Sequence, residues 1–376
     1  MTLPSHIFID TTQDWQACLK KLIQEPRFAV DLEANSMFAY QERVCLIQIS
    51  TADQDYIIDP EANLDLSGLG KIIADPTVEK VFHAAEYDLL LLKKAYGWEL
   101  KNLFDTMWAA RIIGHKRYGL ASLLEALYDI HLDKRFQKSN WCKRPLSIDQ
   151  LQYAQLDTHY LLRLRDDLDK KLQEMGRREE AEIIFAEQCL VTPKENGFSP
   201  NDFWSINGVH ELNTQQQAIL KALTIFRNEE AERRDMPLFK IFGERTLLEL
   251  AAHQPQSLTQ LGHVYGMSHR QVRRYGRTLL QIIANAKNDP PPEPPPRSKR
   301  PPDQVLQRYE ELRLWRKEKG KKRGVESDVI ISREALWTLA RECPQTIEAL
   351  AQLPLVGRWR AQKYGEEILA VLKEAE

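Results

Sequence analysis

The sequence lacks any long apolar run and any recognisable export leader. Of its 376 residues, 43% are hydrophobic and 28% are charged, and no apolar run reaches the ~18 residues needed to span a bilayer. The opening segment MTLPSHIFID has no basic stretch followed by an apolar core, so we expect no secretory signal. We therefore expect a globular, cytoplasmic protein with no membrane association.

Cysteine is scarce, and two glycine-rich signatures are missing. The five cysteines form neither a CxxC pair nor a zinc-binding spacing, and we interpret them as thiols in a reducing compartment. No GxxxxGK[ST] loop is present, which argues against a P-loop helicase or ATPase, and no GxGxxG motif supports a dinucleotide-binding oxidoreductase. The cysteines are Cys18, Cys45, Cys142, Cys189 and Cys343.

The net charge of −2 conceals a difference between the two halves of the chain. Residues 204–376 hold 28 Lys and Arg against 22 Asp and Glu, whereas residues 1–203 hold 24 against 32. An acidic first half followed by a mildly basic second half suits a metal-binding catalytic domain joined to modules that contact polyanions.

Residues 1–200 mix strand and helix patterns. Short apolar runs rich in β-branched residues predict strands, and the capping pair Ser147 and Gln150 predicts the start of a helix that continues to about Met175. The mixture indicates an α/β layered domain. The predicted strands are 28–32, 44–49, 56–58 and 80–82, and the other predicted helices are 86–96, 103–113 and 120–127.

The strand signal ends after residue 204, where an internal repeat begins. Leu250-Ala251 matches Leu339-Ala340, and Tyr275-Gly276 matches Tyr364-Gly365, at a constant offset of 89 residues. The repeat predicts two copies of one helical fold, at 204–287 and 304–376. Between them the proline-rich segment 288–303 predicts an extended linker.

Four carboxylates and a tyrosine lie in predicted strands and helices that are otherwise largely apolar. Asp31 and Glu33 lie two apart in a strand-like run and so leave the same face. Asp88 begins a leucine-rich helix, and Tyr153 and Asp157 lie four apart in a helical run. Carboxylates brought together repel unless cations lie between them. Oxygen ligands suit Mg²⁺ or Mn²⁺, and a pair of such ions makes a phosphodiester-cleaving site.

These motifs resemble those of a known nuclease family. VDLEAN, HAAEYDLLLL and YAQLDTHYL are similar to the three motifs of the DEDD superfamily of 3′→5′ exonucleases, in the subgroup with a tyrosine in the third motif. KIFGERTLLELAAHQP and VRRYGRTLL resemble the HRDC module. One DEDD domain followed by two HRDC modules is the layout of the ribonuclease D family.

The resemblance implies a fold and roles for the residues. It implies an RNase H-like mixed-sheet exonuclease domain followed by two all-α HRDC domains. Asp31, Glu33, Asp88 and Asp157 would hold two Mg²⁺ or Mn²⁺ ions, and Tyr153 would orient the attacking water. The implied substrates are RNA 3′ ends, with precursors of tRNA foremost, and the product is a nucleoside 5′-monophosphate. The family also implies a monomer, and no obligate protein partner is evident.

Five further residues are candidates for substrate contact, each with a structural alternative. His83 could contact the terminal nucleotide or serve the packing. Phe38 could wedge against the terminal base. The basic segment 137–146 could stack a base on Trp141 and hold phosphates with Lys143 and Arg144, or could be a solvated loop around a packed tryptophan.

Two basic stretches and two other functions remain open at this point. The run RLWRKEKGKKR, residues 313–323, and the four arginines of 270–277 could follow a phosphate backbone or be solvated helix faces. A DNA exonuclease is the nearest alternative function. A catalytically inactive nucleic-acid-binding scaffold is another, against which the intact carboxylates argue.

Overall fold

The computed structural model describes residues 3–193, 197–296 and 299–375. Internal contacts group the chain into two compact units. The first contains residues 1–33, 44–193 and 299–376, and the second contains residues 34–43 and 194–298. The predicted boundaries after residues 200, 287 and 303 stay predictions, and residues 297–298 of the predicted linker lie outside the described residues.

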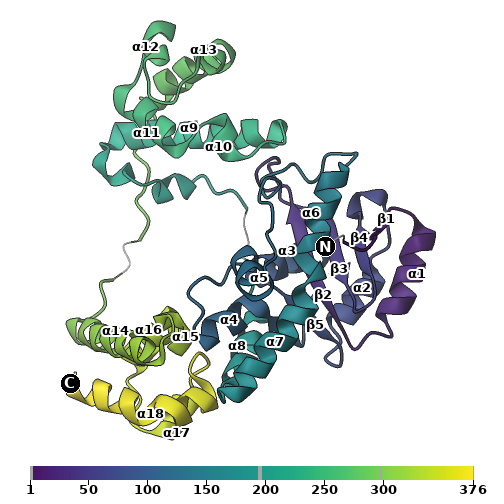
Figure 1. The fold of residues 1–376 in the computed structure, drawn as a ribbon. Coiled ribbons are helices and arrows are strands. Elements are labelled where there is room, and N and C mark those ends of the chain that lie inside the picture. Colours follow the sequence, from purple (N-terminus) through teal and green to yellow (C-terminus); the bar gives the residue numbers. More distant parts are fainter. Residues whose placement is uncertain (1–2, 194–196, 297–298, 376) are drawn as a thin grey trace. The chain divides into compact units, whose positions relative to one another are not determined.

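A six-stranded mixed sheet organises the first unit (Figure 1). Its order is β1-β4-β3-β2-β5-β6. β3 and β4 are antiparallel, whereas β1 with β4, β2 with β5 and β5 with β6 are parallel. The strands are β1 Ile7–Ile9, β2 Arg27–Ala34, β3 Val44–Ser50, β4 Asp55–Ile58, β5 Glu79–Phe82 and β6 Leu103–Asp105.

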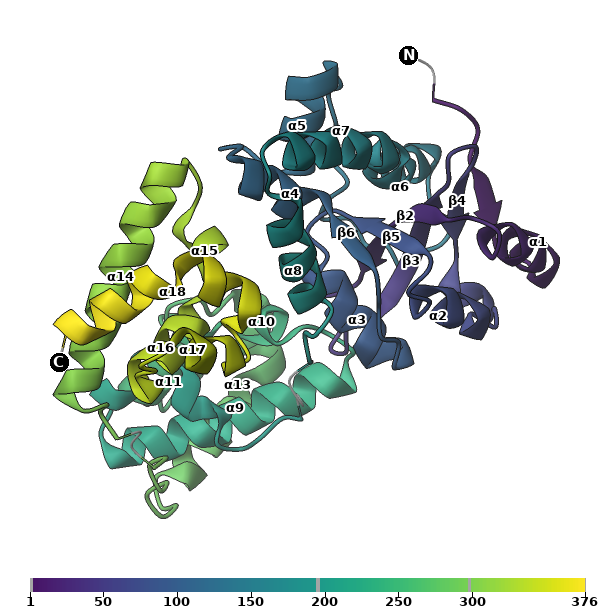
Figure 2. The same cartoon turned by 90° about the horizontal axis from the view of Figure 1, so that it is seen from below.

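Helices cover both faces of this sheet. In Figure 2, α6 and α7 lie on one side of the strands, and α2 and α3 lie on the other. The helices of this domain are α1 Thr12–Leu22, η1 Pro60–Ala62, α2 Ser67–Ile73, α3 Glu86–Tyr96, α4 Thr106–Ile113, α5 Leu120–Tyr128, α6 Ile148–His159, α7 Leu161–Glu174 and α8 Arg178–Gln188. The predicted mixed-sheet fold class is confirmed.

Two predictions of secondary structure are wrong, and one strand is missing from the predictions. Strand β1 was not predicted, because three residues carry too little pattern. The predicted helix 103–113 begins as strand β6, since Leu103 pairs with Lys80 of β5. The predicted long helix to Met175 is two helices that meet at Tyr160. The end of α6 is tied to the sheet by the bond between Thr158 and Ser50 and by that between His159 and Asp55.

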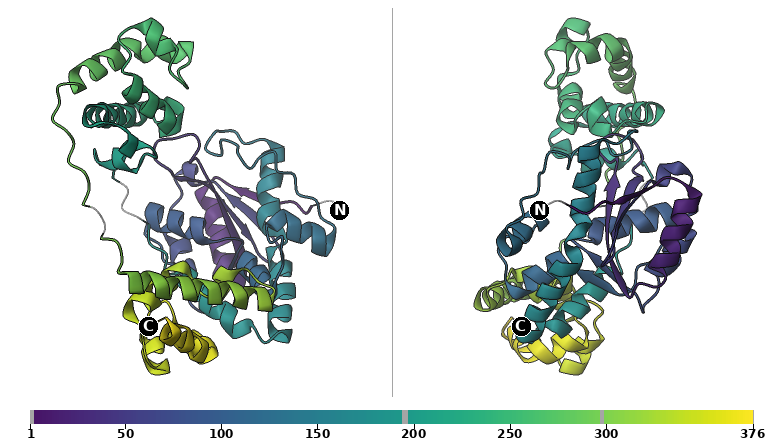
Figure 3. Two further views of the ribbon diagram at one scale, coloured as in Figure 1. Left: turned by 90° about the vertical axis from the view of Figure 1, so that its left-hand side faces the viewer. Right: turned by 45° about the vertical axis from the view of Figure 1, so that its right-hand side comes forward.

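The rest of the described chain is helical, as predicted. Its elements in the second unit are η2 Asp202–Ser205, η3 Val209–Glu211, α9 Thr214–Arg233, α10 Leu238–Ile241, α11 Glu244–His253, α12 Leu258–Gly262 and α13 His269–Ala286. Those in the first unit are α14 Asp303–Arg323, α15 Ser327–Ile330, α16 Arg333–Glu342, α17 Ile347–Gln352 and α18 Gly357–Glu374. Figure 3 shows α14 packed along α16 and α18.

The 89-residue repeat extends to individual hydrogen bonds. Arg227 Nη1 donates to the Phe242 carbonyl. In the second copy, Arg316 Nη1 donates to the Ile331 carbonyl at the corresponding position. Each copy has its own apolar core. The two copies are therefore one fold used twice.

The second copy departs from the first where it packs on the nuclease domain. Glu326 stands where the first copy has Pro237, and its carboxylate pairs with the buried guanidinium of Arg111. Gly320 lies inside α14 and does not interrupt it. A side chain there would approach the Val325 carbonyl oxygen to 3.0 Å, so the close packing of the following turn requires glycine.

Candidate active site

Three carboxylates converge above the centre of the sheet. Asp31 and Glu33 come from β2, and Asp157 comes from α6. One carboxylate oxygen from each lies within 4.8 Å of the others. The two-residue spacing in a strand and the position of α6 across that face bring the three together.

Local structure fixes the helix that carries Asp157. The side chain of Ser147 accepts a hydrogen bond from Gln150 N–H, and the side chain of Gln150 accepts one from Ser147 N–H. This capping box satisfies two backbone donors at the start of α6. At the other end, Thr158 is hydrogen-bonded to Ser50 of β3 at 2.7 Å. The start of α6 is therefore capped, and its C-terminal end is held against the sheet.

Asp88 reaches the same region from the opposite side of the domain. It lies in the first turn of α3, where the positive end of the helix dipole favours a carboxylate. Its side chain is 6% exposed. The negative charges of Asp31 and Asp105 act on it, after burial itself, to raise its pKa well above the usual range.

Burial and mutual repulsion dominate the electrostatics of the cluster. Burial raises the pKa of Asp31 to about 7. Burial, followed by the charges of Asp31, Asp157 and Asp88, raises the pKa of Glu33 to about 10. Burial and then Asp31 raise the pKa of Asp157 well above its ordinary value. No Lys or Arg of the described chain is among the groups that shift these pKa values. The repulsion between the carboxylates is therefore not offset by protein cations.

This chemistry fits a divalent cation. The cluster of Asp31, Glu33 and Asp157 supplies the carboxylate oxygens that such an ion needs. Hard carboxylate oxygens are the ligands that Mg²⁺ and Mn²⁺ prefer. A bound cation would also supply the positive charge that the surrounding protein does not.

Tyr153 stands beside the carboxylates in an aromatic setting. Its ring centroid lies 5.8 Å from that of Trp141 and 6.2 Å from that of Phe136. Burial, followed by the charges of Asp157, Glu33 and Asp31, raises its pKa above the ordinary value. The hydroxyl therefore stays protonated at neutral pH and can donate a hydrogen bond.

The segment 137–146 is pinned to the domain, which changes the interpretation of its residues. Trp141 is 1% exposed, so its ring offers no face to a nucleobase. The guanidinium of Arg144 donates to both carboxylate oxygens of Asp59 and to the carbonyls of Cys45 and Trp141. These two residues serve the packing beside Tyr153, and the prediction that they contact substrate is not supported. Lys143 is exposed.

A disulfide completes this attachment. Cys45 of β3 is bonded to Cys142 across 97 residues of sequence. The interpretation of all five cysteines as thiols is therefore wrong for these two. No local spacing signals a bond between residues so far apart in the chain. The free cysteines of the described chain are Cys18, Cys189 and Cys343.

The remaining candidates for substrate contact lie in two places. His83 follows β5, and its Nδ1 is 2.9 Å from the Thr106 hydroxyl. Burial lowers the pKa of His83 to about 4, so its ring is neutral at pH 7. Phe38 belongs to the second unit, where Nζ of Lys240 lies 4.3 Å from the centroid of its ring.

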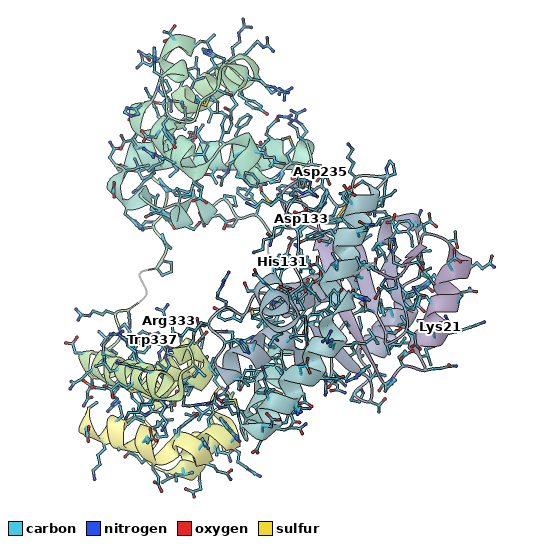
Figure 4. All side chains as sticks on the ribbon, viewed as in Figure 1. Lys21, His131, Asp133, Asp235, Arg333 and Trp337 are labelled. Atoms are coloured by element: carbon cyan, nitrogen blue, oxygen red, sulfur yellow. A yellow bond between two sulfur atoms is a disulfide. The ribbon has the colours of Figure 1, made fainter. Side chains whose placement is uncertain are left out.

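A cavity of about 160 Å³ opens beside Tyr153 and Asp157. Sequence patterns did not indicate it, because its other wall is the irregular segment before α6, which includes Asp133 (Figure 4). The wall combines a charged pair, an amide and aromatic surface, which suits a small polar ligand. The lining residues are Leu132, Asp133, Arg135, Phe136, Asp149, Gln152, Tyr153, Leu156 and Asp157.

The two basic stretches differ in how free their charges are. In 313–323, Arg316 donates to the Ile331 carbonyl, Lys319 pairs with Glu367, and Arg323 pairs with Glu180. These cations serve the fold. By contrast, the four arginines of α13 are exposed on one helix, which makes that helix the more open basic surface. They are Arg270, Arg273, Arg274 and Arg277.

Among the residues described, no helix is both long and apolar enough to cross a membrane.

Comparison with known proteins agrees with the geometry. A 3′-5′ exonuclease family model matches residues 6–173, and an HRDC domain model matches residues 216–283 and 305–372. The two HRDC matches are separated by the same 89 residues as the internal repeat.

Relatives share this layout along their length. Ribonuclease D of Acidiphilium cryptum (strain JF-5) is 31% identical over 98% of this chain and 93% of its own. Escherichia coli RNase D, described as an exoribonuclease involved in structured RNA processing, superimposes with a TM-score of 0.69 at 25% identity over 99% of both chains. The catalytic core of RRP6 from Trypanosoma brucei gives 0.67 at 28% identity over 76% of this chain and 81% of that one. The chain therefore belongs to the ribonuclease D family of 3′-5′ exoribonucleases.

Proposed function

We propose that the protein removes nucleoside 5′-monophosphates from RNA 3′ ends at the cluster formed by Asp31, Glu33 and Asp157. The observation that carries this proposal is the convergence of three carboxylate oxygens within 4.8 Å of one another. Such a cluster destabilises the folded protein unless a cation occupies it. Retaining it is therefore consistent with metal-dependent catalysis and argues against an inactive scaffold.

Each residue has a distinct part in this proposal. Asp31, Glu33, Asp88 and Asp157 would hold two Mg²⁺ or Mn²⁺ ions. When bound, such ions lower the pKa of the attacking water and stabilise the charge that develops on the leaving oxygen. The protonated hydroxyl of Tyr153 donates a hydrogen bond that orients the water. The cavity between Tyr153 and Phe136 would accept part of the nucleotide at the RNA end.

The substrate is proposed from the family. We take the 3′ ends of tRNA precursors and other structured RNAs as the substrates, acted on by a monomer without an obligate protein partner. Cytoplasmic location is part of the same proposal. Because disulfides are rare in reducing compartments, the bond between Cys45 and Cys142 makes a direct check necessary. Alkylating the free thiols in intact cells before lysis, and counting the alkylated cysteines by mass spectrometry, decides whether this bond forms in the cell.

A single assay separates the proposed activity from its alternatives. RNA and DNA of one sequence, each labelled at the 3′ nucleotide, are incubated with the protein in Mg²⁺, Mn²⁺ or EDTA. We expect labelled mononucleotide from RNA first, and none in EDTA or with Asp31→Ala. Asp53→Ala, in the exposed turn between β3 and β4, is the matched control and keeps full activity. Equal release from both polymers would favour the DNA exonuclease, and no release from either would favour the scaffold.

The first helical repeat is the proposed contact for the body of a long RNA. Replacing Arg270, Arg273, Arg274 and Arg277 by glutamine in the full chain should raise KM for long RNA and weaken its salt dependence. Turnover of a short oligonucleotide should not change. Substitution is cleaner than deleting residues 204–376, since deletion would leave buried Arg111 and Glu180 without their partners. An unchanged KM for long RNA rejects this contact.

A further inference from the structure

The turn between β5 and α3 is held by two residues from elsewhere in the chain, the last residue of β6 and the first residue of α4. This turn runs from Phe82 to Glu86 and carries His83 at its start, with Asp88 in the helix that follows. Ala84 has a φ of 63°, a left-handed conformation that a residue with a Cβ rarely adopts. The N-cap of α3, Ala85, has no side chain that could cap the helix. The positive φ of Ala84 costs free energy, and the start of α3 has no side-chain cap. The turn therefore depends on hydrogen bonds with residues elsewhere in the chain.

Asp105, the last residue of β6, supplies the first of these partners. Its Oδ1 accepts hydrogen bonds from the backbone N–H groups of Met107 and Trp108 at 2.8 and 3.1 Å, which caps α4. The same oxygen accepts from Ala84 N–H at 3.2 Å, and Oδ2 accepts from Ala85 N–H at 2.8 Å. One buried carboxylate therefore joins the starts of α3 and α4.

Thr106 supplies the second partner and sets the state of the histidine. Its hydroxyl donates to the Phe82 carbonyl at 2.9 Å. A threonine hydroxyl has one proton, so its bond with His83 Nδ1 must run the other way, with Nδ1–H donating to Oγ1. In the neutral ring Nε2 is then unprotonated. Within the described residues, Nε2 makes no hydrogen bond with protein, so it remains an available acceptor.

We propose that Asp105 and Thr106 are positioning residues of the nuclease. Asp105 holds α3 so that Asp88 faces the carboxylate cluster, and Thr106 fixes His83 so that Nε2 accepts a hydrogen bond from a ribose hydroxyl at the RNA end. The pairing of β2 with β5 brings the turn that contains His83 close to the strand that carries Asp31 and Glu33. Ala29 of β2 pairs with Val81 of β5, so the end of β5, which His83 follows, lies alongside the strand that carries Asp31. The proposal rests on the proposed function and adds the residues that prepare its site.

The first test removes the hydroxyl of Thr106 in the full chain. Thr106→Val should raise KM for a short RNA oligonucleotide about tenfold, which corresponds to one lost hydrogen bond, and should leave kcat within about twofold. Thr106→Ser should restore KM. The matched control is Thr224→Val, since Thr224 is also buried and donates to a backbone carbonyl, that of Leu220. In a His83→Ala background, Thr106→Val should no longer change KM, because the hydroxyl acts through His83.

The second test concerns Asp105 and measures metal binding, so it does not depend on an activity assay. Asp105→Asn can keep the acceptor that caps α4 but presents an amide N–H₂ to Ala85 N–H, so it disturbs α3 selectively. Binding of Mn²⁺ alone, measured by calorimetry, should weaken about tenfold, the range found when supporting residues of a metal site are changed. Far-UV circular dichroism should match that of the unaltered protein.

The outcomes separate this inference from the function on which it rests. If the unaltered protein releases no mononucleotide from RNA, the proposed function fails. If the protein is active, but folded Asp105→Asn binds Mn²⁺ normally or Thr106→Val keeps its KM, the positioning role is overturned. An equal effect of Thr106→Val with and without His83 also overturns it.

Discussion

At the scale of single residues, the carboxylates of the proposed active site weaken the metal-free fold. Carboxyls in an unfolded chain titrate near pH 4, whereas burial raises the pKa of Asp31 to about 7. Between these values the folded protein binds more protons than the unfolded one. The contribution of this carboxyl to the free energy of unfolding therefore falls as pH rises from 4 through 7.

This imbalance predicts the effect of Asp31→Asn. The substitution should raise the free energy of unfolding of the metal-free protein at pH 8 by roughly 2 kcal/mol and flatten its fall between pH 4 and 7, while abolishing activity. Urea denaturation in EDTA across this pH range measures it, with Asp53→Asn as the exposed control. A variant less stable than the unaltered protein at pH 8 would contradict the electrostatic account.

Tyr153→Phe tests the hydroxyl separately from the ring. The ring keeps its contacts with Trp141 and Phe136, so stability should hardly change. Loss of the hydrogen bond to the attacking water should lower kcat about 100-fold and leave KM nearly constant. Tyr128→Phe is the control, because Tyr128 donates to Asp167 outside the site. A tenfold rise in KM with normal kcat would instead make Tyr153 a substrate-binding residue.

At the scale of elements, two helices begin with the same kind of cap, but only one of them carries residues of the proposed site. Ser147 begins α6 and Ser268 begins α13, each in a capping box with a glutamine three residues later. Replacing either serine by alanine should lower stability by about 1 kcal/mol. Ser147→Ala alone should also lower kcat on a short oligonucleotide, because α6 carries Tyr153 and Asp157. Equal kcat for the two variants would show that the start of α6 does not position these residues.

Spacing within one element can be predicted from the sequence, whereas contacts between distant elements cannot. The spacing of Asp31 and Glu33 in a strand, and of Tyr153 and Asp157 in a helix, puts each pair on one face by local geometry alone, so the carboxylate cluster could be predicted. The bonds between Asp105 and the turn at Ala84 join segments about 20 residues apart. They depend on which strands become neighbours, which no local pattern encodes.

The segment 137–146 illustrates the same limit. Its basic composition predicts a surface that contacts phosphates. In the structure Arg144 is neutralised by Asp59, which lies 85 residues earlier in the chain. A cation and its distant partner cannot be matched from one sequence, so composition alone overestimates the basic surface that remains free.

At the scale of the whole molecule, the second helical repeat is part of the nuclease unit. The guanidinium of Arg111 lies between Glu326 and Asp328 and 4.2 Å from the ring centroid of Trp108. Neutralising both acids, as Glu326→Gln with Asp328→Asn, leaves a buried cation with no opposite charge. Because both acids are about half exposed, water reduces the penalty, and we expect a loss of about 2 kcal/mol.

Thermal and urea denaturation of the full chain measure this loss. Glu310→Gln, which removes an exposed pair with Arg313, is the control and should change stability by less than about 1 kcal/mol. If the double variant is as stable as this control, the pairing of the second repeat with Arg111 contributes nothing to stability.

The order in which the chain is made has a consequence for the cell. The four carboxylates are spread from Asp31 in β2 to Asp157 in α6. A ribosome must therefore release α6 before the cluster can close, and a shorter nascent chain has at most an incomplete set of ligands. On the proposed function, the protein therefore cannot degrade the messenger or the tRNAs around it until its nuclease domain has been synthesised and folded.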